Sequence, residues 1–258
     1  MAEKFSSLRI ENAIATLTLA RPERMNALHP AAHYELAGIF DALARDASLR
    51  AVIITGSGKA FCTGYDLKDN LETGKIDLPP SGFGGLTFRD DYPLPLIAAV
   101  NGPAFGGGFE LALACDLIIA ADGARFALPE PKVGWAALGG GLQRLPRAIG
   151  TKRAMSMILT GRSVTAAEGE RLGFVNQAVP DADLLPAANT WAAQIAECAP
   201  LAIRCSKQVA YASLNQPSFA AMMDLNSYST AAPLFESEDA AEGKRAFAQR
   251  RKPDWQGR

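Results

Sequence analysis

The sequence lacks a long apolar run, and it lacks an excess of charge of either sign. No apolar run is long enough to span a bilayer, and the N-terminal stretch MAEKFSSLRIEN has none of the features of a secretory signal. Lys and Arg total 26 and Asp and Glu total 27, so the formal net charge is -1. A near-neutral chain has no overall attraction to nucleic acid or to an anionic membrane. We therefore expect a cytoplasmic protein with neither of these partners.

Cysteine is sparse, with 4 residues in 258, and no two of them have Cys-x-x-Cys spacing. In an intracellular protein, scattered cysteines are usually free thiols that pack as small apolar side chains. We expect this of all four, which are Cys62, Cys115, Cys198 and Cys205.

Histidine is rarer still, with 2 residues, His29 and His33. They lie four positions apart, but there is no His-Glu-x-x-His pattern and no third ligand nearby. We interpret both as surface imidazoles and expect no metal site. The scarcity also argues against a Ser-His or Cys-His nucleophile, which leaves acid–base chemistry to carboxylates.

What is present is an early alternation of apolar strands and amphipathic helices, followed by a helical end. The expected strands are 14–19, 52–55, 96–100, 117–121 and 174–179. The expected helices are 30–44, 107–115, 151–159, 165–172, 184–197, 200–214 and a last one that Ser237 caps and that ends near Arg250. This order is typical of the α/β class with a helical C-terminal region.

A glycine-rich turn after the strand at 52–55 invites comparison with nucleotide-binding loops. In Gly56-Ser57-Gly58-Lys59, the dinucleotide fingerprint would need glycine at position 61, where the chain has Phe61. A P-loop would need Ser or Thr after the lysine, where the chain has Ala60. We therefore interpret these glycines as a turn that ends a strand.

The most informative feature is the triplet Gly106-Gly107-Gly108 at a helix start. The first amides of a helix have no intrahelical partner, so this turn suits an anion or a developing oxyanion. The alternative is close packing of the turn against another backbone. Glu110 follows on the first helical turn, where a carboxylate is also simply stabilised by the helix dipole.

Glu130 lies among apolar neighbours in the stretch FALPE. An apolar pocket would raise its pKa towards neutrality and suit it to proton transfer. From the spacing alone, however, an ordinary loop glutamate is the preferred interpretation.

Three stretches together resemble the crotonase (enoyl-CoA hydratase/isomerase) superfamily, and the match runs from Ile14 to the C-terminus. They are 59–67 (KAFCTGYDL), 98–111 (AAVNGPAFGGGFEL) and 115–130, which opens with CDL and closes with FALPE. Within that family, 104–130 and the C-terminal FAQRRKPDWQGR look most like carnitinyl-CoA dehydratases.

The resemblance implies an α/β fold built as a spiral of ββα units, with the acyl-CoA site in residues 1–200. It implies that residues 201–258 form a helical lid and trimerisation region, within the same domain or as a small second one. It also implies a homo-oligomer, either a trimer or a dimer of trimers. No cofactor is implied, because coenzyme A is part of the substrate.

The same resemblance assigns catalytic roles. The two amides that hold the thioester oxygen fall on Tyr65 and Gly107, and the two hydratase glutamates fall on Glu110 and Glu130. Having both glutamates favours 2-enoyl-CoA hydration or 3-hydroxyacyl-CoA dehydration. The rivals are another reaction of the family, such as double-bond isomerisation, and a non-catalytic binding protein with this fold.

Coenzyme A is expected along the loop 61–66, with phosphate contacts from Arg24, Lys68 and Arg250, the last from this chain or a neighbouring subunit. A run of basic residues from Lys244 onward is usually a solvated helix face, but it could also meet phosphates. The further substrate-binding residues implied by the resemblance are Ala60, Phe61, Thr63, Gly64, Asp66, Gly106, Trp135 and Leu138.

The acyl group is the least determined part of the substrate. Leu138 replaces a glycine that many family members carry near the catalytic water, and Trp135 lies beside it. The segment 69–92 mixes charge, Pro and Gly and is long for a simple connection, so it is either a mobile lid or a wall of the acyl pocket. Side chains able to face a quaternary ammonium are Phe83, Phe88, Tyr92, Trp135, Asp90 and Asp91.

Overall fold

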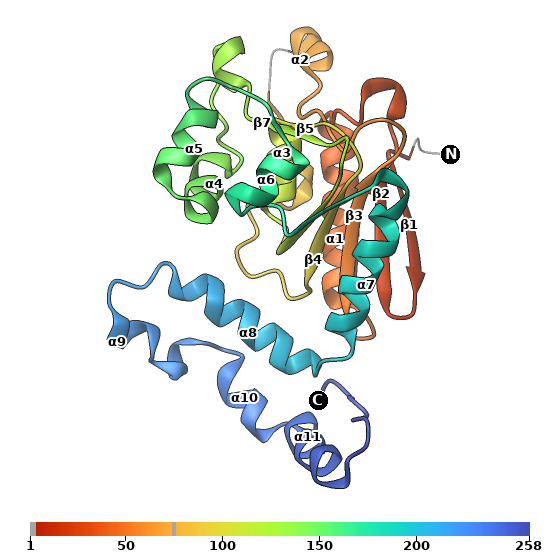
Figure 1. Cartoon of the computed structure of the whole chain (residues 1–258), viewed down its shortest axis with the longest axis vertical. Coiled ribbons are helices and arrows are strands. Elements are labelled where there is room, and N and C mark those ends of the chain that lie inside the picture. Colours follow the sequence, from red (N-terminus) through yellow and green to blue (C-terminus); the bar gives the residue numbers. More distant parts are fainter. Residues whose placement is uncertain (1–3, 74–75) are drawn as a thin grey trace.

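A six-stranded sheet forms the centre of the molecule in the structure, a computed structural model that describes residues 4–73 and 76–258 (Figure 1). The strand order is β1-β2-β3-β4-β6-β9, with β1 antiparallel to β2 and the other neighbouring pairs parallel. The bounds are β1 (Ser6–Glu11), β2 (Ile14–Leu19), β3 (Ala51–Gly56), β4 (Leu96–Val100), β6 (Leu117–Ala121) and β9 (Gln177–Val179).

Three short strands form a second sheet in the order β5-β7-β8. They are β5 (Ala104–Phe105), β7 (Arg125–Ala127) and β8 (Val164–Thr165). β4 enters the large sheet, β5 enters the small one, and helix α3 (Gly107–Leu113) follows. β6 and β7 repeat this pattern before α4 (Gly141–Ile149). The predicted α/β class and spiral of ββα units are therefore confirmed.

The remaining helices cover the sheets or form the C-terminal region. They are α1 (Pro30–Arg45), α2 (Leu67–Thr73), α5 (Thr151–Ile158), α6 (Ala166–Leu172), α7 (Leu184–Ala196), α8 (Pro200–Ser213), α9 (Phe219–Met222), α10 (Ala231–Glu236) and α11 (Glu238–Gln249). Short 3-10 turns are η1 (Pro22–Arg24), η2 (Phe83–Gly85), η3 (Glu130–Val133), η4 (Asp181–Asp183) and η5 (Leu225–Ser227).

The central strands β3 and β4 of the large sheet are buried on both faces, which explains why they are continuous apolar runs. Val52 and Ile54 of β3 belong to one core cluster together with Phe40 of α1. Ile53 belongs to another cluster together with Ala188 of α7. The two helices thus cover opposite faces, and the carboxyl ends of the strands lead into the glycine-rich turns of the site.

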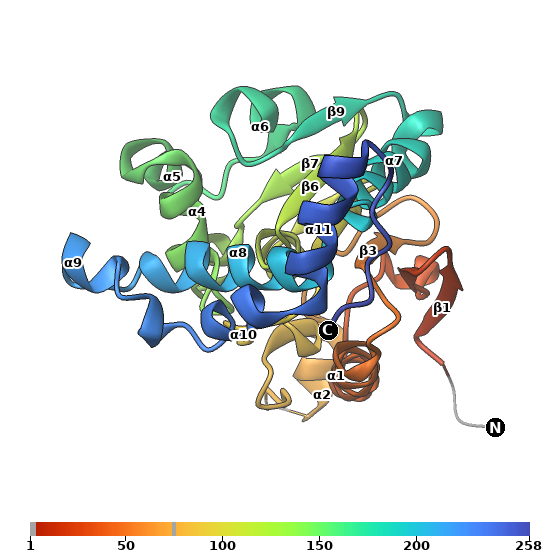
Figure 2. The ribbon, with the colours of Figure 1, turned by 90° about the horizontal axis from the view of Figure 1, so that it is seen from below.

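The C-terminal helices extend from one end of the sheets, and α8 crosses beneath them (Figure 2). Lys207 of α8 fixes this region to the core, because its ammonium contacts Asp116 at 2.7 Å and the Leu94 carbonyl oxygen at 2.8 Å. The prediction that residues 201–258 form a helical region within the same domain or a small second domain stays a prediction. In the described part of the chain, no helix has the length and apolarity needed to cross a membrane.

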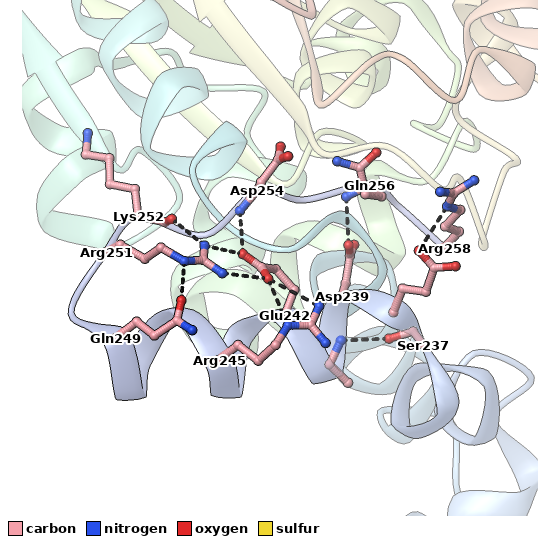
Figure 3. A network of polar contacts seen from close by, with 12 residues as sticks. Ser237, Asp239, Glu242, Arg245, Gln249, Arg251, Lys252, Asp254, Gln256 and Arg258 are labelled. Atoms are coloured by element: carbon pink, nitrogen blue, oxygen red, sulfur yellow. Dashed lines mark hydrogen bonds and ion pairs between the residues drawn. The ribbon is translucent and has the colours of Figure 1, made fainter.

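The last residues fold back onto α11 (Figure 3). Gln256 N–H and Gly257 N–H donate to the Asp239 carboxylate at 2.7 and 2.9 Å. Hydrogen bonds from Arg251 hold the pKa of Glu242 at about 2. Part of the basic C-terminal run is therefore paired within the chain, and whether the rest of it meets phosphates stays a prediction.

Several element bounds differ from those expected. The helix that begins at Gly107 ends at Leu113, and the strand expected at 174–179 begins at Gln177. β5 lies inside the glycine-rich stretch that looked like a turn. Its two residues pair with β7, and Ala104 also forms a bridge with Cys62, and these long-range contacts leave no local periodicity. Gly74 and Lys75, within the segment 69–92, lie outside the described residues.

All four cysteines are free, as expected. Cys62, Cys115 and Cys205 are buried, and Cys198 is exposed on the surface.

Candidate active site

The glycine triplet at the start of α3 combines close packing with an open turn. A Cβ on Gly108 would lie 1.9 Å from the Cys62 carbonyl oxygen, so backbone packs on backbone there. Gly106 has φ +53°, and a Cβ there would lie 3.0 Å from Oε1 of Glu130. The close-packing interpretation of the triplet is therefore confirmed at Gly108, and Gly106 leaves room for the Glu130 carboxylate.

The loop that carries Tyr65 runs directly beside this turn. Phe105 N–H donates to the Cys62 carbonyl at 3.0 Å, and a Cβ on Gly64 would lie 3.2 Å from the Gly107 nitrogen. Within residues 4–73 and 76–258, neither Tyr65 N–H nor Gly107 N–H donates a hydrogen bond to another residue. Unpaired amides of this kind can bind an anion or a developing oxyanion. The structure thus brings together the two amides that the resemblance singled out.

Glu110 is buried on α3, with 4% of its surface exposed. Gly141 N–H, at the start of α4, donates to its Oε1 at 2.9 Å. Burial raises the pKa of Glu110 to about 7, and the charge of Glu130 contributes to the rise against the hydrogen bond from Gly141. A carboxylate with a pKa near neutrality is matched to proton transfer at physiological pH.

Glu130 is the first residue of η3 and is also buried. Burial raises its pKa, and among the described residues its Oε2 has no hydrogen-bond partner. The spacing-based preference for an ordinary loop glutamate was therefore wrong, because packing against the Gly106 turn removes this side chain from solvent. A buried carboxylate oxygen without a hydrogen-bond partner destabilises the folded protein unless a ligand or a water donates a hydrogen bond to it.

Aromatic rings form a wall next to the two amides. The ring of Phe83 would lie 2.6 Å from a Cβ on Gly107, so only glycine leaves it this position. The Tyr65 ring contacts that of Trp135 with centroids 6.3 Å apart. Trp135 is 37% exposed and Leu138 68% exposed, so both are accessible near the glycines that hold Glu110.

His33 is not the surface imidazole expected from the sequence. It is fully buried on α1, where its Nδ1 accepts a hydrogen bond from Gly84 N–H at 3.0 Å. Burial lowers its pKa to about 3, so the ring is neutral at physiological pH. It stacks on Tyr65 and meets Phe83 edge-on, which makes it a support for the aromatic wall. His29 has a different role, since its Nδ1 caps α1 by accepting from Ala32 N–H.

The residues expected to bind coenzyme A lie in different environments. Thr63 N–H donates to the Met25 carbonyl at 3.2 Å, which places the exposed Arg24 beside the loop 61–66. Lys68 is exposed, whereas Ala60 and Phe61 are buried beneath the loop. Arg250 ends α11, far from α2 in this chain (Figure 1).

Asp66 is already paired within the protein. Its carboxylate contacts Arg21 at 3.2 Å and accepts from Lys68 N–H at 3.2 Å. Burial opposes ionisation of Asp66, but these partners and Asp69 N–H outweigh it and lower the pKa. These contacts within the protein already account for the burial and charge of Asp66 without a substrate. Its role in substrate binding stays a prediction.

The side chains proposed to face a cationic acyl group fall into two sets. Tyr92 is buried and donates to the Phe40 carbonyl at 3.1 Å, and its ring already has Arg89 and Lys207 within 6 Å, at 5.9 and 5.8 Å. Phe88, Asp90, Asp91 and Tyr92 all line one cavity of about 880 Å³ between the segment 86–92, α4 and α8, and Leu138 lines it too. Only Phe83 and Trp135 remain beside the amides.

Two features of the site were missed by sequence reasoning. Gly141 holds the Glu110 carboxylate, and the triplet 139–141 that contains it was visible as a signal of close backbone approach. Asp77 N–H donates to the Tyr65 hydroxyl at 3.3 Å, and the Asp77 carboxylate accepts from Tyr34 at 2.9 Å. No local pattern signals this second contact.

Comparison with known proteins identifies the family. The profile described as enoyl-CoA hydratase/isomerase matches residues 9–258. A carnitinyl-CoA dehydratase of Citrobacter koseri is 42% identical over 253 residues, covering 95% of both chains. One from Proteus mirabilis is 40% identical over 256 residues, covering 97% of this chain and 98% of the relative.

Solved structures agree. The crystal structure of an enoyl-CoA hydratase from Mycobacterium tuberculosis H37Rv has a TM-score of 0.93 and 39% identity, covering 99% of this chain and all (100%) of that one. That of an enoyl-CoA hydratase from Bacillus anthracis has a TM-score of 0.90 and 32% identity, covering 99% and 100%. The chain belongs to the enoyl-CoA hydratase/isomerase (crotonase) family, and the resemblance stated from the sequence is confirmed. It is an enzyme of this family, whose reactions act on acyl-CoA.

Proposed function

We propose that this enzyme adds water to a 2-enoyl-CoA, or removes it from a 3-hydroxyacyl-CoA, with Glu110 and Glu130 acting on one water. The observation that carries the proposal is the pair of buried glutamates beside two unpaired amides. An isomerase needs one such base, and a binding protein needs neither, so retention of both supports hydration over these rivals.

The proposed steps follow from the chemistry of a conjugated thioester. Glu110, as carboxylate, takes a proton from water while the water oxygen bonds to C3. The electron pair of the double bond moves to the thioester oxygen, where Tyr65 N–H and Gly107 N–H stabilise the enolate, each worth roughly 10²–10³ in rate. Glu130 then gives its proton to C2. Dehydration is the reverse, with the same groups in opposite roles.

The direct test is loss of the absorbance of the conjugated thioester when crotonyl-CoA is added. A panel that also contains crotonobetainyl-CoA addresses the finer question raised by the carnitinyl-CoA dehydratase relatives. Hydration of at least one panel member is the expected result. Isomerisation of a 3-enoyl-CoA without hydration of any 2-enoyl-CoA would instead establish the one-base rival.

We expect replacement of Arg24 or Arg250 with Ala to raise KM with little change in kcat. Phosphate contacts are made equally in the ground state and the transition state, so their loss weakens binding without slowing chemistry. Steady-state kinetics with the best panel substrate measures this. Lys152→Ala, an exposed position on α5, is the control. An unchanged KM in both variants would remove these residues from the coenzyme A site.

We expect Trp135→Ala to change acyl preference more than turnover of crotonyl-CoA. If the acyl group carries a quaternary ammonium, loss of the exposed ring should lower the preference for the cationic substrate by about 0.5–2 kcal/mol, or roughly 2- to 30-fold in kcat/KM. The measurement is the ratio of kcat/KM for crotonobetainyl-CoA and crotonyl-CoA. Phe219→Ala, an exposed aromatic position on α9, is the control. An equal ratio in wild type and Trp135→Ala would argue against a cation-selective wall.

A further inference from the structure

We propose that Arg144 is a positioning residue for Glu110. Its guanidinium connects two parts of the chain: the glycine turn that contacts the Glu110 carboxylate, and the segment that carries Phe83. The catalytic meaning of this role rests on the proposed function, but the link itself is a property of the free protein. Arg144 lies on the first turn of α4, directly after the glycines that contact Glu110.

The contacts of Arg144 reach in two directions. Its Nη2 donates to the Thr87 carbonyl oxygen at 2.8 Å. Its Nη1 would lie 2.0 Å from a Cβ on Gly140, a residue with φ +109° that leads into the helix. Glycine at this position therefore serves both the left-handed turn and the close approach of the guanidinium. The next residue, Gly141, donates to Glu110.

On the other side, Thr87 continues the link to the wall of the site. It is 1% exposed, and its Oγ1 accepts from Phe83 N–H at 2.9 Å. The Phe83 ring packs against Gly107, one of the two unpaired amides. The Arg144 side chain thus connects two parts of the site. Through α4 it reaches Glu110, the proposed base, and through Thr87 it reaches the aromatic wall beside the predicted oxyanion site.

The charge of Arg144 supports the same role. In the described part of the chain it forms no ion pair with a carboxylate, and burial lowers its pKa. Its positive charge lowers the pKa of Glu110, whereas burial and the charge of Glu130 raise that pKa. Other titratable groups that act on Arg144 are Tyr211, Cys115 and Arg147, and Asp116 and Lys207 line the same cavity. Loss of the positive charge should therefore raise the pKa of Glu110.

Arg144→Gln removes the charge and the forked donor, and Arg144→Lys keeps only the charge. We expect Arg144→Gln to shift the titration of Glu110 to higher pH and to lower kcat roughly 10- to 100-fold with KM nearly unchanged, as misplacement of a catalytic group does. Arg144→Lys should titrate close to wild type but still show a reduced kcat. The matched control is Arg147→Gln, an exposed cation of the same helix that contacts Asn215.

The first measurement is the pH titration of the Glu110 carboxyl carbon by NMR of protein labelled with [δ-¹³C]glutamate, assigned with Glu110→Gln. It needs no substrate, so failure of the proposed hydration would not affect it. Hydration kinetics of the same variants form the second. An Arg144→Gln titration that coincides with wild type would overturn the proposal. If that variant does not fold, wild-type kcat in Arg144→Lys would overturn the positioning role.

Discussion

Glu110→Gln and Glu130→Gln are each expected to lower kcat for hydration by about 10²–10⁴ while thioester binding stays nearly intact. Glutamine keeps the shape of the side chain, and at Glu110 it keeps an acceptor for Gly141 N–H, but it cannot exchange a proton. The double variant should be little worse than the worse single one, because the two carboxylates act on one water.

Steady-state hydration by the three variants measures this, and equilibrium binding of a saturated acyl-CoA checks that the pocket is intact. Glu197→Gln, an exposed position just after α7, is the control for loss of a carboxylate elsewhere. Isomerase chemistry makes a different forecast, in which one replacement is nearly silent. A single variant with near wild-type hydration would therefore replace the two-carboxylate mechanism with the one-base rival.

The elements that the sequence predicts well are those whose signal is local. β3 and β4 are apolar runs because both faces of the sheet are covered, and the N-cap Ser237 is confirmed by its hydrogen bond from Ala240 N–H at 3.0 Å. The free amides at Gly107 follow from a helix start without side chains. Such features depend on a few consecutive residues, so pattern alone identifies them.

The features that escaped prediction depend on contacts between distant segments. His33 has no apolar signature, yet tertiary packing against Tyr65 and Phe83 buries it completely. Glu130 looked like a loop residue because its burial comes from the turn at Gly106, more than 20 positions away in the chain. The role proposed for Glu110 and Glu130 comes from the family resemblance, and their burial comes from the structure.

Removing the charge of Glu110 should also stabilise the protein at high pH. Burial raises the pKa of Glu110 from 4.5 to about 7, so the folded state binds this proton more tightly than the unfolded state. The free energy of unfolding therefore falls as pH rises from 4.5 to 7, because a charge must be kept in a buried site. The shift corresponds to about 3 kcal/mol, at 1.36 kcal/mol per unit.

Glu110→Gln has no such proton to lose, so its stability should not follow this part of the pH dependence. We expect Tm of the variant and of wild type to be similar near pH 4.5 and to separate by roughly 5–10 °C at pH 8, with the variant higher. Thermal unfolding by circular dichroism across this range measures the difference, with Glu197→Gln as the exposed control. A variant that melts at or below wild type at pH 8 would show that Glu110 is not held in a charge-disfavouring site. The burial that we expect to destabilise the folded protein at pH 8 also gives Glu110 a pKa near neutrality, which suits the proton transfer proposed for it.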